Sequence, residues 1–284
     1  MATQIIDDEP IEVYHARPYA SSSKLKDFLA RGHAYYKREY LRPPEAPSPV
    51  RESTDAQTFG QAFEDAVLFR DDMDKWHDRY TVRPPGLDLR TNKGKEWKAT
   101  VPAHATILTH AEGYAIERMV HNTFANKTAR AMIENAVPQR TLREVNLSGA
   151  WEHVPGLQGR PDYLGDGVVQ TSGLAYSLDL KAMSDFQMFV GGQHIEKFAY
   201  DMQAAIVKEL LPHVEPYCLL AEKVSPWRVV VVEFPDELLA HGAMLLDRGM
   251  SLLSVAHRDG DWPLHPCEMV TAGVPGRVRA RLPE

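Results

Sequence analysis

Cysteine is scarce in this sequence, which holds only Cys218 and Cys267 among its 284 residues. Two cysteines exclude a disulfide framework and a four-cysteine zinc or iron–sulfur site. Long apolar runs are missing too: there is no stretch of about 18 apolar residues, which a membrane span requires. The first residues, MATQIIDDEPIEV, lack the basic and apolar blocks of a signal peptide. We therefore expect a cytoplasmic protein that makes no membrane contact.

Positive charge is in short supply as well. The chain has 32 Lys and Arg against 39 Asp and Glu, a net charge of −7. This argues against a protein that coats DNA electrostatically. It does not exclude an enzyme that holds nucleic acid locally, because acidic metal ligands contribute to the count and a bound metal reverses their effect. The 12 histidines include no His-Glu-x-x-His pair, which argues against a zinc enzyme.

The first half of the chain is predicted to be mainly helical, because its apolar residues recur at helical spacing. Three serines at 21–23 and Thr109 are suitable N-cap residues. Residues 1–18 are expected to form an extended lead, residues 42–54 a Pro-rich linker, and residues 71–105 a polar, basic and irregular connection. The predicted helices cover residues 22–38, 55–69, 110–127 and 128–136.

From about residue 142 the pattern changes to short alternating segments, which are typical of strands. Strands followed by helices predict an α/β fold, with a mixed central sheet flanked by helices and a helical N-terminal elaboration. The uninterrupted valines at 229–232 fit a central strand covered on both faces. The predicted strands cover residues 142–151, 159–164, 174–182, 217–221 and 227–234, and the later helices cover residues 194–211 and 236–255.

The length and composition fit one elaborated domain over residues 1–284, because 44% of the residues are hydrophobic and 25% are charged. Within it we expect an N-terminal helix and linker (1–54) and a core (55–257). The core carries a helical insertion (106–137), and an irregular tail (258–284) follows.

The most informative stretch runs from residue 159 to 183. Asp179 and Lys181 alternate with leucines, so in a strand they share one face while the leucines enter a core. Asp162 lies on an earlier short segment, and turn residues separate the two. A bent hairpin would bring Asp162 beside Asp179.

Two carboxylates and a lysine on adjacent strands fit a site for Mg²⁺ and a water. Mg²⁺ prefers hard oxygen ligands, lowers the pKa of a bound water and neutralises charge on a phosphate. A neighbouring ammonium can orient the water. The competing interpretation is a surface ion pair on an edge strand, since a second acidic-x-Lys triplet ends at Lys98 in a polar stretch.

The helix predicted over 55–69 adds one further carboxylate. Glu64 borders the apolar stripe of this helix, so it either reaches out to solvent or joins a site. Gly60 costs ~1 kcal/mol relative to Ala in a helix interior. We therefore expect another backbone to approach the helix closely at Gly60.

In order and spacing, the segments Arg160-Pro161-Asp162 and Asp179-Leu180-Lys181 resemble the second and third motifs of the PD-(D/E)xK nuclease superfamily. The likeness is to its RecE-type exonucleases (exodeoxyribonuclease VIII), in the RecB-like branch that includes lambda exonuclease. Three further segments support the resemblance: the serine-rich opening after Tyr19, the helical segment from Phe59 to Glu64, and the segment from Tyr200 to Gln203 at the start of a helix. The resemblance spans about residues 19–235.

The resemblance implies a restriction-endonuclease-like core and a role for each matched residue. Asp162 and Asp179 would hold Mg²⁺, for which Mn²⁺ would substitute, with Glu64 and the Leu180 carbonyl completing the ligands. Lys181 would position the attacking water or help to deprotonate it. Arg160, Tyr200 and Gln203 would contact the substrate, or Gln203 would orient Lys181. For Tyr200 and Gln203, ordinary helix packing is the alternative.

By the same resemblance, the chain would be a Mg²⁺-dependent exonuclease that acts on double-stranded DNA ends in phage- or prophage-type recombination or repair. A single-strand annealing protein and a ring-shaped homo-oligomer would be its partners. Two positions depart from the family pattern: Glu64 replaces a histidine and Val207 a tyrosine. Three alternatives stay open: a structure-specific or restriction-type endonuclease on the same core, a non-catalytic DNA-end or partner-binding module with a decayed site, and a soluble α/β protein with unrelated chemistry.

Overall fold

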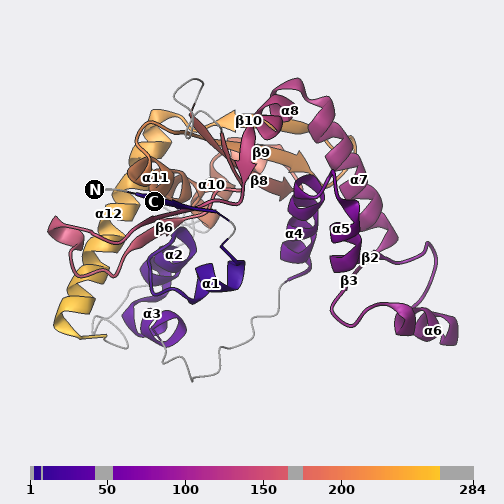
Figure 1. Cartoon of the computed structure of the whole chain (residues 1–284), viewed down its shortest axis with the longest axis horizontal. Coiled ribbons are helices and arrows are strands. Elements are labelled where there is room, and N and C mark those ends of the chain that lie inside the picture. Colours follow the sequence, from indigo (N-terminus) through magenta and orange to yellow (C-terminus); the bar gives the residue numbers. More distant parts are fainter. Residues whose placement is uncertain (1–2, 8, 42–53, 166–174, 263–284) are drawn as a thin grey trace, which may run out of the picture.

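A five-stranded mixed sheet forms the centre of the molecule, in the strand order β10-β9-β8-β7-β4 (Figure 1). The computed structural model describes residues 3–7, 9–41, 54–165 and 175–262. Only β8 and β9 are parallel; every other pair in this sheet is antiparallel. The predicted α/β class is therefore confirmed. The strands are β4 (Ala136–Pro138), β7 (Tyr163–Gly165), β8 (Tyr176–Met183), β9 (Glu215–Glu222) and β10 (Val229–Glu233).

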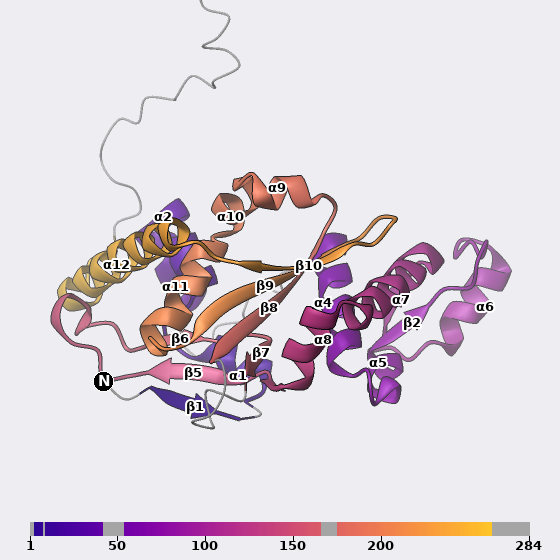
Figure 2. The same cartoon turned by 90° about the horizontal axis from the view of Figure 1, so that it is seen from above.

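Helices cover both faces of this sheet (Figure 2). Neighbouring residues of β7 point to opposite faces: Leu164 joins the core beneath α2, α11 and α12, whereas Tyr163 joins the core beneath α4, α7 and α8. A third core lies beneath α9 and α10. These helices are α2 (Ser22–Arg31), α4 (Asp55–Leu68), α7 (His110–Ala125), α8 (Lys127–Glu134), α9 (Phe186–Val190), α10 (Gln193–Phe198), α11 (Tyr200–Leu210) and α12 (Asp236–Asp259).

Capping explains the helix starts that were predicted well. Thr54 and Gln57 form a reciprocal capping box at the start of α4, and Thr109 and Glu112 form another at the start of α7. Two helices that were predicted as single are broken. Gly32, with φ 81°, separates α2 from α3 (His33–Tyr40), and Ala199, with φ 55°, separates α10 from α11.

A second sheet, in the order β1-β5-β6, holds the N-terminal segment. The expected extended lead is wrong here, because residues 4–6 pair with β5 and a short helix follows. The strand predicted over 159–164 is also wrong: it divides between β6 in this sheet and β7 in the central one. The elements are β1 (Gln4–Ile6), α1 (Ile11–Ala16), β5 (Thr141–Glu144), η1 (Gly149–Trp151) and β6 (Leu157–Gly159).

The connection over 71–105 is ordered rather than irregular. It contains two helices and one strand of a small parallel pair, β2 with β3. Propensity alone missed these elements because each is short and mostly polar. They are α5 (Met73–Arg79), β2 (Tyr80–Val82), α6 (Asn92–Thr100) and β3 (Thr106–Leu108).

Three smaller expectations are corrected. The valine strand β10 lies at the edge of the sheet and is only partly buried, so it is not a doubly covered central strand. Within the described part of the chain, a Cβ placed on Gly60 would meet no atom within 4 Å apart from its own helix and chain neighbours, so the expected approach of another backbone is not found there. The last helix runs on to Asp259. Most of the predicted linker and tail, and the turn residues 166–174, lie outside the described residues. Of the helices that are described, none has the length and apolar character to cross a membrane.

Candidate active site

The register between β7 and β8 brings Asp162 beside Asp179. Tyr163 pairs with Leu178, and one step further along the same antiparallel register places Asp162 opposite Asp179. The Leu180 backbone N–H donates to Asp162 Oδ2 at 2.6 Å. The predicted juxtaposition is therefore confirmed, whereas the roles of the two carboxylates stay predictions.

Lys181 lies on the same face of β8 as Asp179, as the alternation predicted. Its Nζ forms an ion pair with Asp179 Oδ2, and both side chains are largely buried, with 18% and 17% exposed for Lys181 and Asp179. Gln203, on α11, donates from Nε2 to the other oxygen, Asp179 Oδ1, at 2.9 Å. Asp179 is thus held from two sides, and within the described residues this carboxylate is the one hydrogen-bond partner of the Gln203 side chain.

Glu64 reaches the same place from α4, which packs against β8. The four charged side chains Glu64, Asp162, Asp179 and Lys181 line one cleft of about 800 Å³. The sequence left open whether Glu64 reaches out to solvent or joins a site, and the structure places it in a cleft shared with the other three charged side chains. The N-terminal segment makes another wall of the cleft; the serine-rich opening after Tyr19 was the one sequence signal in it, and residues 9–15 carried none. That wall includes Glu9, Pro10, Ile11, Glu12, Tyr14, His15, Ser22 and Ser23.

The cleft holds more negative charge than its own lysine balances. Burial raises the pKa of Glu64 to about 7; Lys181 opposes the shift, and the charges of Asp179 and Asp65 add to it. Burial also raises the pKa of Asp162 well above its usual range, with the neighbouring carboxylates adding to the effect. Without a further cation, these groups hold protons more tightly than ordinary carboxylic acids do.

The same charges act in the opposite direction on the lysine. Burial alone would lower the pKa of Lys181, but Asp179, Asp162 and Glu64 together raise it well above its usual range. Lys181 is therefore an ammonium group at neutral pH. Its Nζ also lies 5.5 Å from the centre of the Tyr200 ring, within reach of a cation–π contact.

As the side chains stand, they do not form a closed metal site. Among the described residues, no group of three or more His, Cys, Asp or Glu is arranged to hold an ion. Asp179 is occupied by Lys181 and Gln203, and Asp162 by a backbone N–H. The donor chemistry nevertheless fits a hard divalent cation, because the carboxylates of Glu64, Asp162 and Asp179 face one cleft. The Leu180 carbonyl faces the same strand edge as its N–H and so lies on the Asp162 side.

Arg160 does not extend freely into the cleft. It donates to the Glu9 backbone carbonyl at 2.7 Å and to Gln139 Oε1 at 3.3 Å. It therefore ties the loop that carries Asp162 to the N-terminal segment. This contact joins positions 151 residues apart, which a local motif cannot reveal.

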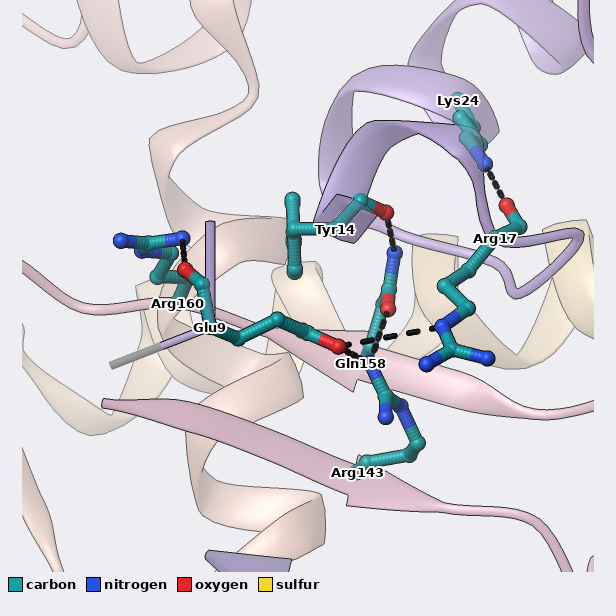
Figure 3. A network of polar contacts seen from close by, with 7 residues as sticks. All are labelled: Glu9, Tyr14, Arg17, Lys24, Arg143, Gln158 and Arg160. Atoms are coloured by element: carbon teal, nitrogen blue, oxygen red, sulfur yellow. Dashed lines mark hydrogen bonds and ion pairs between the residues drawn. The ribbon is translucent and has the colours of Figure 1, made fainter. Parts of the chain in front are cut away.

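Arg160 belongs to a wider polar network under the N-terminal segment (Figure 3). Both Glu9 carboxylate oxygens accept from Arg143 Nη2 at 2.8 Å, and Arg17 lies 3.8 Å from the same carboxylate. Gln158 donates to the Tyr14 carbonyl at 3.0 Å. The network fixes the segment that forms one wall of the cleft.

The neighbour of Glu64 has a different task. Asp65 is buried and accepts hydrogen bonds from Tyr80 Oη at 2.8 Å, Arg79 Nη1 at 3.1 Å and Gln61 Nε2 at 3.1 Å. The bonds from Arg79 and Tyr80 hold α4 against α5 and β2, whereas the bond from Gln61 lies within α4. Asp65 is therefore a structural carboxylate on the edge of the cleft.

The sequence matches no protein-family model and none of the curated proteins. Its fold, however, is similar to a crystal structure at 2.19 Å resolution from Eubacterium rectale, which is described as a "Putative exonuclease". The similarity covers 95% of this chain and 97% of that chain, with a TM-score of 0.59 and 14% sequence identity. At this identity the likeness concerns the fold: the mixed sheet flanked by helices, on which the cleft of Asp162, Asp179, Lys181 and Glu64 is built, is shared with that protein.

Proposed function

We propose that this protein is a metal-dependent nuclease that hydrolyses phosphodiester bonds in DNA. One observation carries the proposal: the β7–β8 register places Asp162 opposite Asp179, in a cleft that also receives Lys181 and Glu64. The similar fold of the Eubacterium rectale protein, with its description as an exonuclease, supports the same reaction class.

Glu64, Asp162 and Asp179, with the Leu180 carbonyl, would hold Mg²⁺, and Mn²⁺ would substitute. When bound, the ion supplies charge neutralisation at the phosphate and acidifies water. Hydrolysis adds the hydroxide of water to phosphorus, breaks the phosphorus–oxygen bond to the leaving group and gives that oxygen a proton.

The residues of the chain would orient and stabilise the reactants. Lys181 could either position the attacking water as an ammonium group or deprotonate it as a base. The raised pKa of Lys181 favours the first of these two roles. Gln203 would act as a positioning residue, because it holds Asp179. Tyr200, whose ring lies beside Lys181, would keep the ammonium in place. Arg160 would hold the Asp162 loop and contact a phosphate that enters the cleft.

The finer assignment is a RecE-type exonuclease that acts on double-stranded DNA ends in phage- or prophage-type recombination. It follows from the resemblance of the motif segments and their order. A single-strand annealing protein would receive the product strand, and a homo-oligomeric ring would be the working form.

The direct test is purified protein with end-labelled linear duplex, with and without Mg²⁺. We expect stepwise loss of nucleotides from the ends with Mg²⁺ only. Asp179→Ala and Lys181→Ala should abolish it. Asp74→Ala and Lys75→Ala are matched controls on the exposed surface of α5 and should retain full activity.

Activity that survives Asp179→Ala would remove the mechanism. Cleavage of closed circular DNA would instead favour the endonuclease on the same core. No heat of binding for Mg²⁺ or Mn²⁺ in calorimetry, together with no cleavage, would favour the non-catalytic module.

A further inference from the structure

A small projecting unit, residues 80–108, carries a net positive charge and is rooted beside the cleft at Tyr80; we call it the arm. It consists of β2, α6 and β3, and β2 pairs with β3 in parallel across α6. Both views show α6 standing away from the body, at the right-hand end of the molecule (Figures 1 and 2). None of the motif residues belongs to the arm.

The root of the arm is fixed beside the cleft. Tyr80 lines the cleft and donates to the buried Asp65, which follows Glu64 on α4. On the other side β2 packs against α7 at Gly113, where a Cβ would lie only 2.7 Å from Val82 Cγ1. The arm therefore has a defined direction relative to the reacting groups.

The tip of the arm also has a defined structure, held by helix capping and close packing. Thr91 caps α6 by accepting from the Gly94 N–H at 3.1 Å. Gly94 packs so tightly that a Cβ there would lie 2.1 Å from the Asp88 carbonyl oxygen. Trp97 lies against the 84–87 loop, around a hollow of about 300 Å³. A folded helix thus presents the side chains of α6 at set positions.

Those side chains concentrate positive charge in an acidic protein. The arm holds five Lys and Arg against two Asp and Glu, a net charge of +3, whereas the whole chain carries −7; the rest therefore carries −10. Lys93, Lys95 and Lys98 are exposed, and none of them forms an ion pair within the described residues. Arg90, in contrast, is paired with Asp88.

We propose that the arm binds the phosphate backbone of the nucleic acid whose scissile bond lies in the cleft. This inference rests on the proposed function. Three unpaired ammonium groups on one short helix match a polyanion, and an adjoining acidic body needs such a local attractor. Lysines on α6 suit contacts with the phosphate backbone of the nucleic acid, since an ammonium group acts as a point charge and a phosphate contact carries no base sequence information.

The test compares Lys93→Gln/Lys95→Gln/Lys98→Gln with a control of equal charge, Lys37→Gln/Lys75→Gln/Lys127→Gln, whose lysines are exposed on other helices. Gln keeps helix propensity, so the fold should persist, which circular dichroism checks. Binding of a fluorescent 30-base-pair duplex is followed by anisotropy in EDTA over a salt series. Sedimentation velocity reports the oligomeric state of each protein.

Each lost phosphate contact lowers the slope of log affinity against log salt by about 0.9, so three contacts account for about 2.7. Between 50 and 200 mM salt the wild type should then lose about 40-fold more affinity than the arm variant. The control variant should behave like the wild type.

Equal slopes for all three proteins would overturn the inference, as would absence of duplex binding by the wild type at low salt. An unchanged slope with an altered sedimentation coefficient would overturn it too and make the arm a contact between copies. The binding test and the cleavage test can fail independently. A lower salt slope for the arm variant, without Mg²⁺-dependent cleavage by the wild type, would support DNA binding by the arm and contradict the nuclease proposal. Cleavage by the wild type with equal salt slopes would support the nuclease proposal and contradict DNA binding by the arm.

Discussion

Two groups of buried charge lie on either side of the Arg160 loop, and they are built in opposite ways. In the N-terminal network, the Glu9 carboxylate faces Arg143 and Arg17. Burial alone would raise the pKa of Glu9, but hydrogen bonds and charge from Arg143, with smaller contributions from Thr141 and Arg17, hold it below the ordinary value. The negative charge there is fully compensated.

In the cleft, three carboxylates share one lysine, and the pKa values of Glu64 and Asp162 are raised. A buried charge that lacks a partner costs free energy, so under the proposed function a bound cation would supply the missing charge. On that proposal the network serves stability, whereas the cleft gives up stability for binding. Four variants test this division.

Asp162→Asn should have the largest effect on activity. The amide oxygen can still accept from the Leu180 N–H, but one negative charge is lost, so cleavage should fall about 10³-fold or more. The midpoint of thermal unfolding without metal should stay equal or rise, because repulsion is relieved. Both are measured on one preparation. A lower midpoint of thermal unfolding with retained cleavage would show that Asp162 serves stability, as the charges of the N-terminal network do.

Glu9→Ala should mainly cost stability. Arg143, whose side chain is 6% exposed, would be left buried without its carboxylate, at a cost of about 3–5 kcal/mol. Urea unfolding measures the loss. The control is Glu134→Ala, which removes surface ion pairs with Arg130 and Arg70 and should cost about 1 kcal/mol or less. A similar, small loss for both variants would contradict the distinction.

Gln203→Ala tests how the cleft positions its own groups. Loss of the hydrogen bond to Asp179 should lower kcat about 10- to 100-fold, as for other residues that orient metal ligands. KM should change little, since Gln203 acts through Asp179. A raised KM with unchanged kcat would instead place Gln203 directly on the substrate.

The smallest expected effect is a pH dependence of stability in EDTA. The pKa of Glu64 is about 7 in the folded protein against 4.5 ordinarily, so between these values the folded state binds a proton that the unfolded state has released. Stability should therefore fall as the pH rises through this window. Glu64→Gln should make the fall shallower, leaving the part due to Asp162, and added Mg²⁺ should flatten it. The exposed control Glu134→Gln should leave the slope as in the wild type.

Sequence reasoning was strongest where the information is local. Capping residues and apolar spacing located α4 and α7, and alternation located β8 with Asp179 and Lys181 on one face. It also anticipated that Asp162 would meet Asp179, because two short strands that are close in sequence commonly pair antiparallel, as β7 and β8 do. The E. rectale structure then confirmed the α/β class.

Periodicity by itself determined which side of each element is apolar, and motif spacing determined which residues were candidates for chemistry. Only the tertiary structure decided what covers each face. It set β10 at the edge, placed Glu64 in the cleft and brought the N-terminal segment against the cleft as a wall. The reason is physical: the Glu9–Arg143 pair joins residues 134 positions apart, and such contacts form through packing and desolvation, which leave no mark on neighbouring residues.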